Sequence, residues 1–327
     1  MKIGRIGRVG ALVAAAALAL TACSDGGSGD AGSGGGSGDF TFASGGTGGV
    51  YYPLANEYAN IFNDNIEGVT VNAVESDGSV DNLGRIARGD AQIALTQNNT
   101  AVEAVTGTGQ FADLDADMSE IGWIGKLYPE AAQVITMADS GIESIEDLAG
   151  KRVAIGAPGS GARAVAEAIL DEYGITDFEA YEEGFADART LMQDGNLDAS
   201  IEILGVPAAA LSELAATSDV QVLPLSQEAA DAIAETTAFE PYTIPAGTYD
   251  FVEEDTLTVS VFASVVASNS AVSEDQGYEI TKAIFERSGE ISLAQGDLIN
   301  LEEALMGQGE VPLHPGAQKY FEEQGLL

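Results

Sequence analysis

Three glycine-containing turns have the residue types and spacing that could do chemistry. The first, Ser44 to Pro53, carries four glycines between an apolar run and a helix-like segment. The second is Asp77-Gly78-Ser79 and the third is Gly156 to Arg163, each again between strand-like and helix-like segments. A helix N-terminus offers unpaired N–H groups and a partial positive charge, and glycine lets a ligand approach the backbone closely. This arrangement predicts a site that captures a small anion.

The third turn has the glycine spacing of a nucleotide-binding P-loop but lacks that loop's functional residues. Ala162 and Arg163 stand where a P-loop needs a lysine for the phosphates and a serine or threonine for magnesium. We therefore expect a carboxylate-sized anion, with Ser160 and backbone N–H groups as its donors. Arg163 either adds a bidentate clamp or is a solvated arginine of the first helical turn.

Amide and aromatic side chains near these turns leave two interpretations each. Gln97 and Asn98 follow an apolar run, at the strand end where open α/β sheets bind ligands. Amides at this place either orient a polar ligand or, at Asn98 and Asn99, cap the next helix. Tyr51 and Tyr128 either line a pocket with their rings and hydroxyls or belong to the core.

The composition is strongly acidic. The 327 residues include 52 Asp and Glu against 13 Lys and Arg, which gives a formal net charge of −39. Such a charge argues against nucleic acid and against direct adhesion to anionic lipid. Glu75 and Glu202 lie beside expected loops and could receive a ligand ammonium, but we expect both at the surface.

Catalytic and metal chemistry have few candidates. His314 is the only histidine and Cys23 the only cysteine, so we expect no Ser-His-Asp set, no Cys-His set and no histidine-rich metal site. We expect no catalytic residues, no metal and no cofactor. A hydrolase that uses two carboxylates is the enzymatic alternative, although nothing in the sequence places such a pair.

The sequence pattern at the N-terminus predicts an export signal followed by a tether. Residues 1–22 combine a basic start with an apolar run that is too short to span a bilayer as a helix. Leu20-Thr21-Ala22-Cys23 resembles the bacterial lipobox, in which the cysteine is lipidated; the alternative is an ordinary secretory signal with an incidental cysteine. Residues 23–39 are rich in Gly, Ser and Asp and form a flexible tether. The chain is thus expected on the extracytoplasmic face of a bacterial membrane.

From residue 40 onward, short apolar runs alternate with amphipathic segments, which predicts an α/β body. We expect two lobes, one formed by 40–128 plus about 266–327 and the other, with the hinge, by about 129–265. The chain should cross between them near Leu127-Tyr128 and between Ile244 and Ala267. Expected strands are 40–43, 69–74, 91–95, 122–127, 134–137, 151–155, 199–204, 220–223 and 259–266. Expected helices begin after Pro53 and at 80, 142, 165, 186, 275 and 317, and another follows residues 96–99 and runs to about Val105.

An ordered set of motifs resembles the TAXI family, the extracytoplasmic solute-binding subunits of one branch of TRAP transporters. The resemblance covers essentially all of residues 40–327. Its motifs are Gly45-Gly46-Thr47-Gly48-Gly49-Val50-Tyr51-Tyr52-Pro53, Gly78-Ser79-Val80-Asp81-Asn82-Leu83, Asp147 to Val153, Gly156 to Gly161, Asp198-Ala199, Gly205-Val206-Pro207 and Pro312 to Ala317.

This resemblance implies a type II periplasmic-binding-protein fold, in which two α/β lobes close over a ligand and deliver it to TRAP permease subunits in the membrane. It implies a carboxylate ligand such as glutamate or glutamine. Asn98 and Asn99, Ala162, and Glu75 or Ser76 depart from the family pattern, and these departures concern the ligand rather than the fold. Carried over by position or read from the turns, the expected ligand contacts are Gly45, Thr47, Gly48, Gly49, Tyr51, Ser79, Gln97, Asn98, Tyr128, Ser160, Gly161 and Arg163.

The sequence therefore favours a transport binding protein for a small carboxylate. A lipid-anchored sensor that presents its ligand to a signalling receptor is the alternative from another class. The exported carboxylate-dependent hydrolase is the third.

Overall fold

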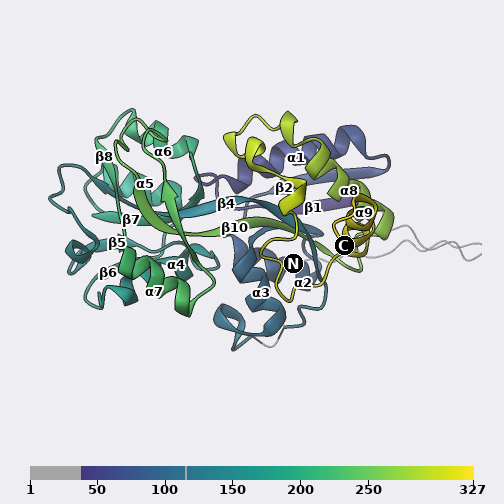
Figure 1. The fold of residues 1–327 in the computed structure, drawn as a ribbon, viewed down its shortest axis with the longest axis horizontal. Helices are drawn as coiled ribbons and strands as arrows, with labels where there is room; N and C mark the ends of the chain where they lie inside the picture. Colours follow the sequence, from purple (N-terminus) through teal and green to yellow (C-terminus); the bar gives the residue numbers. More distant parts are fainter. Residues whose placement is uncertain (1–37, 115) are drawn as a thin grey trace, which may run out of the picture. The chain divides into compact units, whose positions relative to one another are not determined.

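The computed structural model describes residues 38–114 and 116–327. The described strands form one mixed sheet in which β4 and β10 are central (Figure 1). The strand order is β2 (Val69–Val74), β1 (Gly38–Ala43), β3 (Ile93–Gln97), β10 (Thr256–Ser268), β4 (Ile121–Met137), β7 (Ala199–Gly205), β5 (Arg152–Ala154) and β6 (Glu179–Tyr181), while β8 (Val220–Leu223) pairs with β4 and β9 (Glu240–Ile244) pairs with β10.

Helices divide into two sets around this sheet. The set around β1, β2 and β3 consists of α1 (Tyr51–Asn65), α2 (Ser79–Arg88), α3 (Asn98–Thr106), α8 (Glu274–Glu286) and α9 (Pro315–Gln324). The set around β5 to β8 consists of α4 (Ala162–Glu172), α5 (Phe185–Gln193), α6 (Ala209–Ala215) and α7 (Gln227–Thr236). Short 3-10 helices occupy Gly109–Phe111, Ile145–Leu148, Ser288–Glu290, Ala294–Leu298 and Leu301–Glu303.

Each half of the sheet carries a hydrophobic core on both faces. On β3, Ile93 and Leu95 pack in one apolar cluster and Ala94 packs in another, because successive side chains point to opposite faces. In the other half of the sheet, Ile201 and Leu204 of β7 likewise belong to different apolar clusters, one on each face. The described body is therefore two α/β lobes, and the long strands β4 and β10 run through both (Figure 1).

Most expected elements are present, and the largest correction concerns β4. The sequence predicted separate strands at 122–127 and 134–137, whereas the structure has one strand of 17 residues. The apolar pattern breaks at Pro129 and Glu130, but both residues stay in register with β10. Tertiary pairing overrides the local break. The short strands β6 and β9 and the helices α6 and α7 were not predicted.

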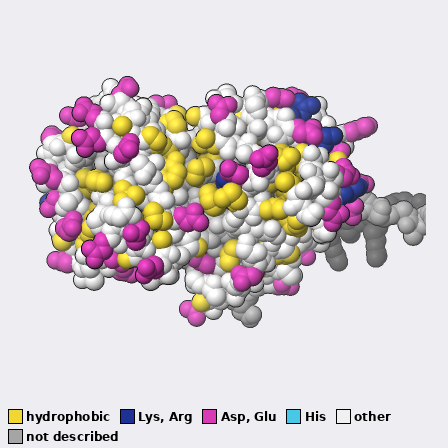
Figure 2. All heavy atoms as spheres, viewed as in Figure 1, with side chains coloured by type: hydrophobic (Ala, Val, Ile, Leu, Met, Phe, Trp, Pro, Cys, Tyr) yellow, Lys and Arg dark blue, Asp and Glu magenta, His cyan; other side chains and the backbone are white. Residues whose placement is uncertain are grey.

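The predicted lobe boundaries, near 128 and near 265, fall within β4 and β10 and stay a prediction. Acidic side chains cover much of the face seen in Figure 2, where basic side chains are few. Within the described residues, we find no helix with the length and apolar character needed to cross a membrane.

Candidate functional site

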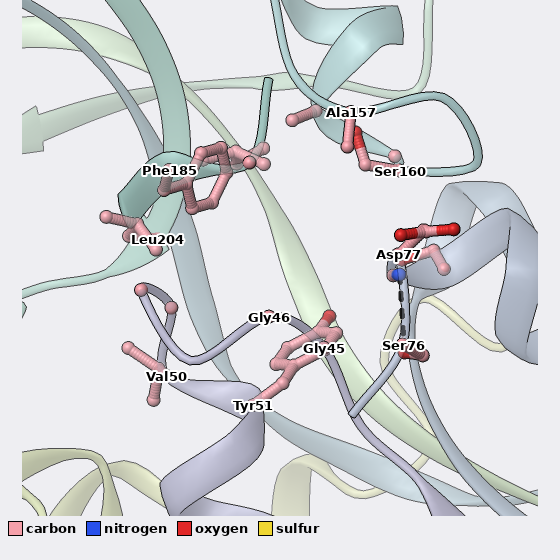
Figure 3. A pocket seen from close by; sticks show the side chains of 18 of the residues that line it. Gly45, Gly46, Val50, Tyr51, Ser76, Asp77, Ala157, Ser160, Phe185 and Leu204 are labelled. Atoms are coloured by element: carbon pink, nitrogen blue, oxygen red, sulfur yellow. Dashed lines mark hydrogen bonds between the residues drawn. The ribbon is translucent and has the colours of Figure 1, made fainter. Parts of the chain in front are cut away.

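A cavity of about 400 Å³ lies where the three glycine-containing turns meet. The first turn joins β1 to α1, the second joins β2 to α2, and the third joins β5 to α4. Figure 3 shows Gly45 and Tyr51, Asp77, and Ser160 arranged around this space, one group from each turn. The first and second turns belong to the lobe around β1, β2 and β3, which we call the first lobe. The third turn belongs to the lobe around β5 to β8, the second lobe, so the cavity lies between the two lobes.

The structure places most of the predicted ligand contacts on the cavity wall. α1 begins at Tyr51 and α4 at Ala162, so N–H groups that lack partners within the helix start at this wall. Two wall atoms, Gln97 Oε1 and Ser160 Oγ, are buried and have no hydrogen-bond partner in the described part of the chain. The predicted residues on the wall are Gly45, Gly48, Gly49, Tyr51, Ser79, Gln97, Ser160 and Gly161.

Four predicted contacts lie off the wall. Thr47 is exposed, and its N–H donates to Glu75 Oε1 at 3.3 Å. Tyr128 is fully buried in the core of the first lobe. Asn98 neither faces the cavity nor caps α3, because its Oδ1 accepts from the Phe262 N–H at 2.8 Å and its Nδ2 donates to the Gly307 carbonyl.

Arg163 is the fourth residue off the wall. Its Nε donates to Glu167 Oε1 at 2.8 Å and its Nη1 donates to Glu182 Oε1 at 2.6 Å. With both carboxylates in place, the guanidinium is already neutralised outside the cavity. The structure thus favours the first-turn arginine over the ligand clamp. The expected lipidation site, Cys23, lies outside the described residues.

Glu130 is a wall residue that the sequence analysis missed. Its carboxyl is 3% exposed and accepts a hydrogen bond from Tyr51 Oη at 2.9 Å. Burial raises the pKa of this carboxyl to about 8, while hydrogen bonds from Tyr51 and Gln97 act in the opposite direction. The available signal was that Glu130 is the one acidic residue in the mostly apolar stretch 121–137. Other wall residues not predicted are Ser76, Asp77, Arg85, Phe185, Asp187 and Leu204.

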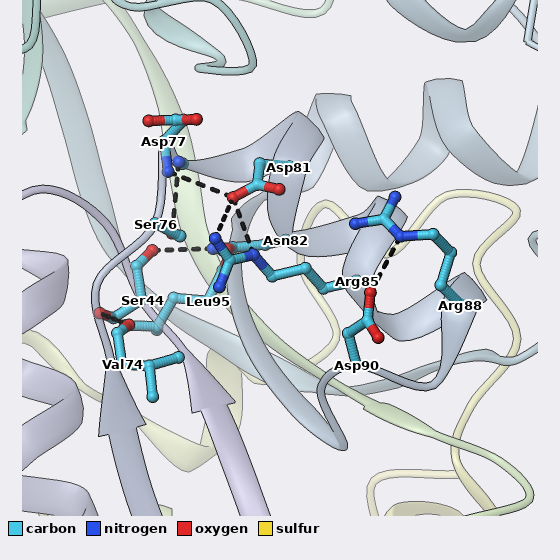
Figure 4. A network of polar contacts seen from close by, with 11 residues as sticks. Ser44, Val74, Ser76, Asp77, Asp81, Asn82, Arg85, Arg88, Asp90 and Leu95 are labelled. Atoms are coloured by element: carbon cyan, nitrogen blue, oxygen red, sulfur yellow. Dashed lines mark hydrogen bonds and ion pairs between the residues drawn. The ribbon is translucent and has the colours of Figure 1, made fainter. Parts of the chain in front are cut away.

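The rest of the wall is also acidic. Glu75, Asp77 and Asp187 are exposed carboxylates on it. Arg85 is the basic residue on the described wall, and it pairs with Asp81 at 2.8 Å (Figure 4). The described residues hold no group of three or more His, Cys, Asp or Glu suited to a metal ion.

Part of the N-terminus of α2 is used by the protein itself. The N–H groups of Val80 and Asp81 donate to the Gly159 carbonyl of the third turn, at 3.0 and 3.1 Å. Asp81 Oδ2 in turn accepts from the Asp77 N–H at 3.3 Å (Figure 4). The second turn therefore joins the lobes more than it offers N–H groups to a ligand.

The first turn also contacts the second lobe. Arg189 Nη1 of α5 donates to the Gly48 carbonyl at 2.8 Å, and the same guanidinium pairs with Glu202. A Cβ on Gly48 would lie 2.5 Å from the backbone nitrogen of Ala186, so only glycine allows this approach. Glu202, expected at the surface, is fully buried; the sequence could not show that Arg189 neutralises it.

Comparisons with solved structures support the fold. The alkanesulfonate-binding protein SsuA from Xanthomonas axonopodis pv. citri, bound to MOPS, is 12% identical, with a TM-score of 0.51 over 87% of this chain and 83% of that one. A protein from Bordetella bronchiseptica RB50 is 19% identical, with a TM-score of 0.52 over 88% and 82%. Tv2483 bound to L-arginine is 10% identical, with a TM-score of 0.50 over 77% and 87%.

These similarities confirm the predicted fold class, an α/β type II periplasmic-binding-protein-like fold of two lobes with a cleft between them. A family model described as NMT1-like matches residues 42–325, nearly the whole described body. The chain therefore belongs to the NMT1-like family.

Proposed function

We propose that this chain is an extracytoplasmic solute-binding protein that captures a small carboxylate and delivers it to a membrane permease. The observation that carries the proposal is the meeting of the α1 and α4 N-termini on one cavity between two lobes. Both termini favour a negative ligand group by their N–H donors and their partial charge. A volume of about 400 Å³ suits a small metabolite.

The known ligands of similar structures agree with such a role. One is named as an alkanesulfonate-binding protein bound to MOPS and another is bound to L-arginine, so this fold accommodates both a sulfonate and an amino acid. We propose further, from the ordered motifs at 45–53, 78–83 and 156–161, that the permease is of the TRAP type and that the chain is a TAXI subunit. No catalytic role is proposed for any wall residue.

The lobes would close because the ligand has a higher affinity for the closed form than for the open form. A ligand held by α1 on one lobe and α4 on the other binds the closed form better than the open form, and so shifts the equilibrium towards closure. The permease would then recognise the closed form. In this proposal the lobes are 40–128 plus about 266–327, and about 129–265.

The proposal is tested by a thermal-shift screen of the chain that begins at residue 23 against amino acids, dicarboxylates and sulfonates, followed by calorimetry. We expect at least one small carboxylate to raise the melting temperature. Ser160→Asp, which adds a negative charge at the N-terminus of α4, should weaken that ligand at least tenfold. A screen in which no carboxylate stabilises the protein would contradict the proposal.

A further inference from the structure

Two buried glutamates of this protein differ in whether a basic side chain pairs with them. Glu202 is fully buried and has Arg189 as its counterion. Glu130 is 3% exposed, lies on the cavity wall, and forms no ion pair with any described basic residue. Its hydrogen-bond partners, Tyr51 and Gln97, are both uncharged donors. A buried carboxylate without a counterion is costly, so either it stays protonated or a bound cation completes it.

The surroundings of Glu130 select the kind of cation. Among the described wall residues, Arg85 alone is basic, and Asp81 already pairs with it. Three exposed carboxylates, Glu75, Asp77 and Asp187, line the same cavity and add to the negative potential. A second free carboxylate on a ligand would meet repulsion from these groups.

The cavity thus has two chemically different parts. The N-termini of α1 and α4 present N–H donors, and Ser160 adds a hydroxyl whose oxygen is unpaired within the described residues. Glu130 presents a carboxyl from β4, which Tyr51 fixes at 2.9 Å. A ligand that satisfies both parts needs an anionic and a cationic group a few bonds apart.

Building on the proposed function, we infer that Glu130 binds an ammonium group of the ligand, so that the cavity selects amine-bearing carboxylic acids and rejects carboxylates without an amine. The ammonium supplies the counterion that the protein lacks at this place. If Glu130 is protonated before binding, its proton goes to solvent as the ammonium binds, and the ligand keeps all of its own protons.

Other groups that face Glu130 do not compete for this role. Burial raises the pKa values of Tyr51 and Tyr128 well above 10, so both phenols stay neutral at physiological pH. Glu75, Asp77, Asp187 and the paired Arg85 face the cavity from the second turn, α2 and α5. Burial raises the pKa of Glu130 itself to about 8, which places its ionisation within an accessible pH range.

The test is calorimetry of the chain that begins at residue 23 with matched ligand pairs. L-Alanine is compared with L-lactate, and L-glutamate with L-2-hydroxyglutarate, because each pair differs only in ammonium against hydroxyl. We expect the amine member of a pair to bind at least tenfold more tightly at pH 8. Titrations in two buffers of different ionisation enthalpy should show release of most of one proton at pH 7. Affinity should rise with pH between 6 and 8.

Glu130→Gln keeps the acceptor for Tyr51 but cannot ionise. We expect this variant to lose the preference for the amine member and the proton release, whereas Glu67→Gln, at an exposed position away from the cavity, should keep both. If Glu130→Gln fails to fold, the number of protons that the unmodified chain releases on ligand binding still tests the inference.

Four outcomes would overturn the inference. Equal affinities within each pair, or amine binding without proton release at pH 7, would remove Glu130 as the ammonium site and leave the proposed function intact. Unchanged preference in Glu130→Gln would do the same. Absence of binding by every carboxylate tested would overturn the proposed function together with this inference.

Discussion

Glu130 on β4 and Glu202 on β7 show how one residue type acquires two roles. Glu202 is buried in the second lobe and forms an ion pair with Arg189, which balances its charge. Glu130 has hydrogen-bond donors but no described cation, and it faces the cavity. Nothing in the two local sequences distinguishes them. The difference arises because Arg189 on α5 reaches Glu202, whereas Tyr51 on α1 reaches Glu130.

Glu130 should make the ligand-free protein less stable as pH rises. Its pKa is about 8 in the folded chain and near 4.5 when unfolded, so the native state binds more protons between these values. Its stabilising contribution is complete below about pH 4.5 and is lost as pH rises through about 8. We expect urea unfolding between pH 5 and 8 to show a flatter pH dependence in Glu130→Gln than in the unmodified chain. Parallel curves for the two proteins would contradict this assignment.

The ion pair of Arg189 and Glu202 should respond to single and double replacement differently. Arg189→Met leaves a buried carboxylate without a partner and should cost about 3–5 kcal/mol of unfolding free energy. Adding Glu202→Met removes that uncompensated group, so the double variant should recover part of the loss. Chemical denaturation of the four proteins in the cycle measures this; a double variant less stable than Arg189→Met would show that the pair is not the cause.

At the scale of elements, the three turns share a sequence pattern but differ in use. Each joins a strand to a helix, as predicted from its glycines. The first and third turns place the N-termini of α1 and α4 at the cavity, while Val80 and Asp81 of α2 donate to Gly159 of the other lobe. Gly48 lies on the cavity wall, and its lack of a Cβ also allows close packing against α5.

Gly48→Ala should keep the lobes apart. The new Cβ would lie 2.5 Å from the Ala186 nitrogen, and backbone atoms cannot move aside as a flexible side chain can. We expect a larger radius of gyration by small-angle scattering and a loss of about 1–3 kcal/mol in unfolding free energy. Gly46→Ala, in the same turn, has open space around its Cβ and should leave both quantities unchanged. Identical behaviour of the two variants would show that Gly48 does not control lobe contact.

At the scale of the whole molecule, the proposed site for a small carboxylate has to function in a protein with a formal net charge of −39. Screening by salt confines the field of exposed acids to about 8–10 Å, so acids away from the cavity contribute little there, whereas Glu75, Asp77 and Asp187 act on it together with the helix N-termini. In the proposed function, tight ligand binding therefore depends on closure, because the third turn of one lobe lines the same cavity as the first and second turns of the other. The global charge governs solubility, and the local donors govern recognition.

The export signal expected from residues 1–22 gives a prediction for the chain in its cell. If Cys23 carries a lipid, Cys23→Ser should move the protein from the membrane fraction to the soluble extracytoplasmic fraction. Labelling with a fatty-acid analogue should mark the unmodified protein and not the variant. A soluble unmodified protein would favour an ordinary secretory signal with an incidental cysteine.

The fold was predictable largely because its signals are local. Alternating apolar runs and helix-like segments predicted the α/β class, and β2 and β8 have the predicted bounds. The break at Pro129 and Glu130 misled because pairing with β10 on one side and β7 on the other keeps β4 continuous through it, with a register shift against β10 next to Pro129. Helix α6 has few large apolar residues, so its pattern was too weak to predict.

The sequence by itself determined the three turns, because a glycine between an apolar run and an amphipathic segment encodes a strand-to-helix turn locally. It also determined that the body has no cysteine and no site built from several histidines, since Cys23 is the only cysteine and His314 the only histidine of the chain. Only the tertiary structure decided which side chains meet at the cavity. Tyr51 and Glu130 are 79 positions apart, and Gly48 and Arg189 are 141 apart. Residues far apart in the sequence set the environment of a buried charge, so this environment cannot be predicted from the local sequence.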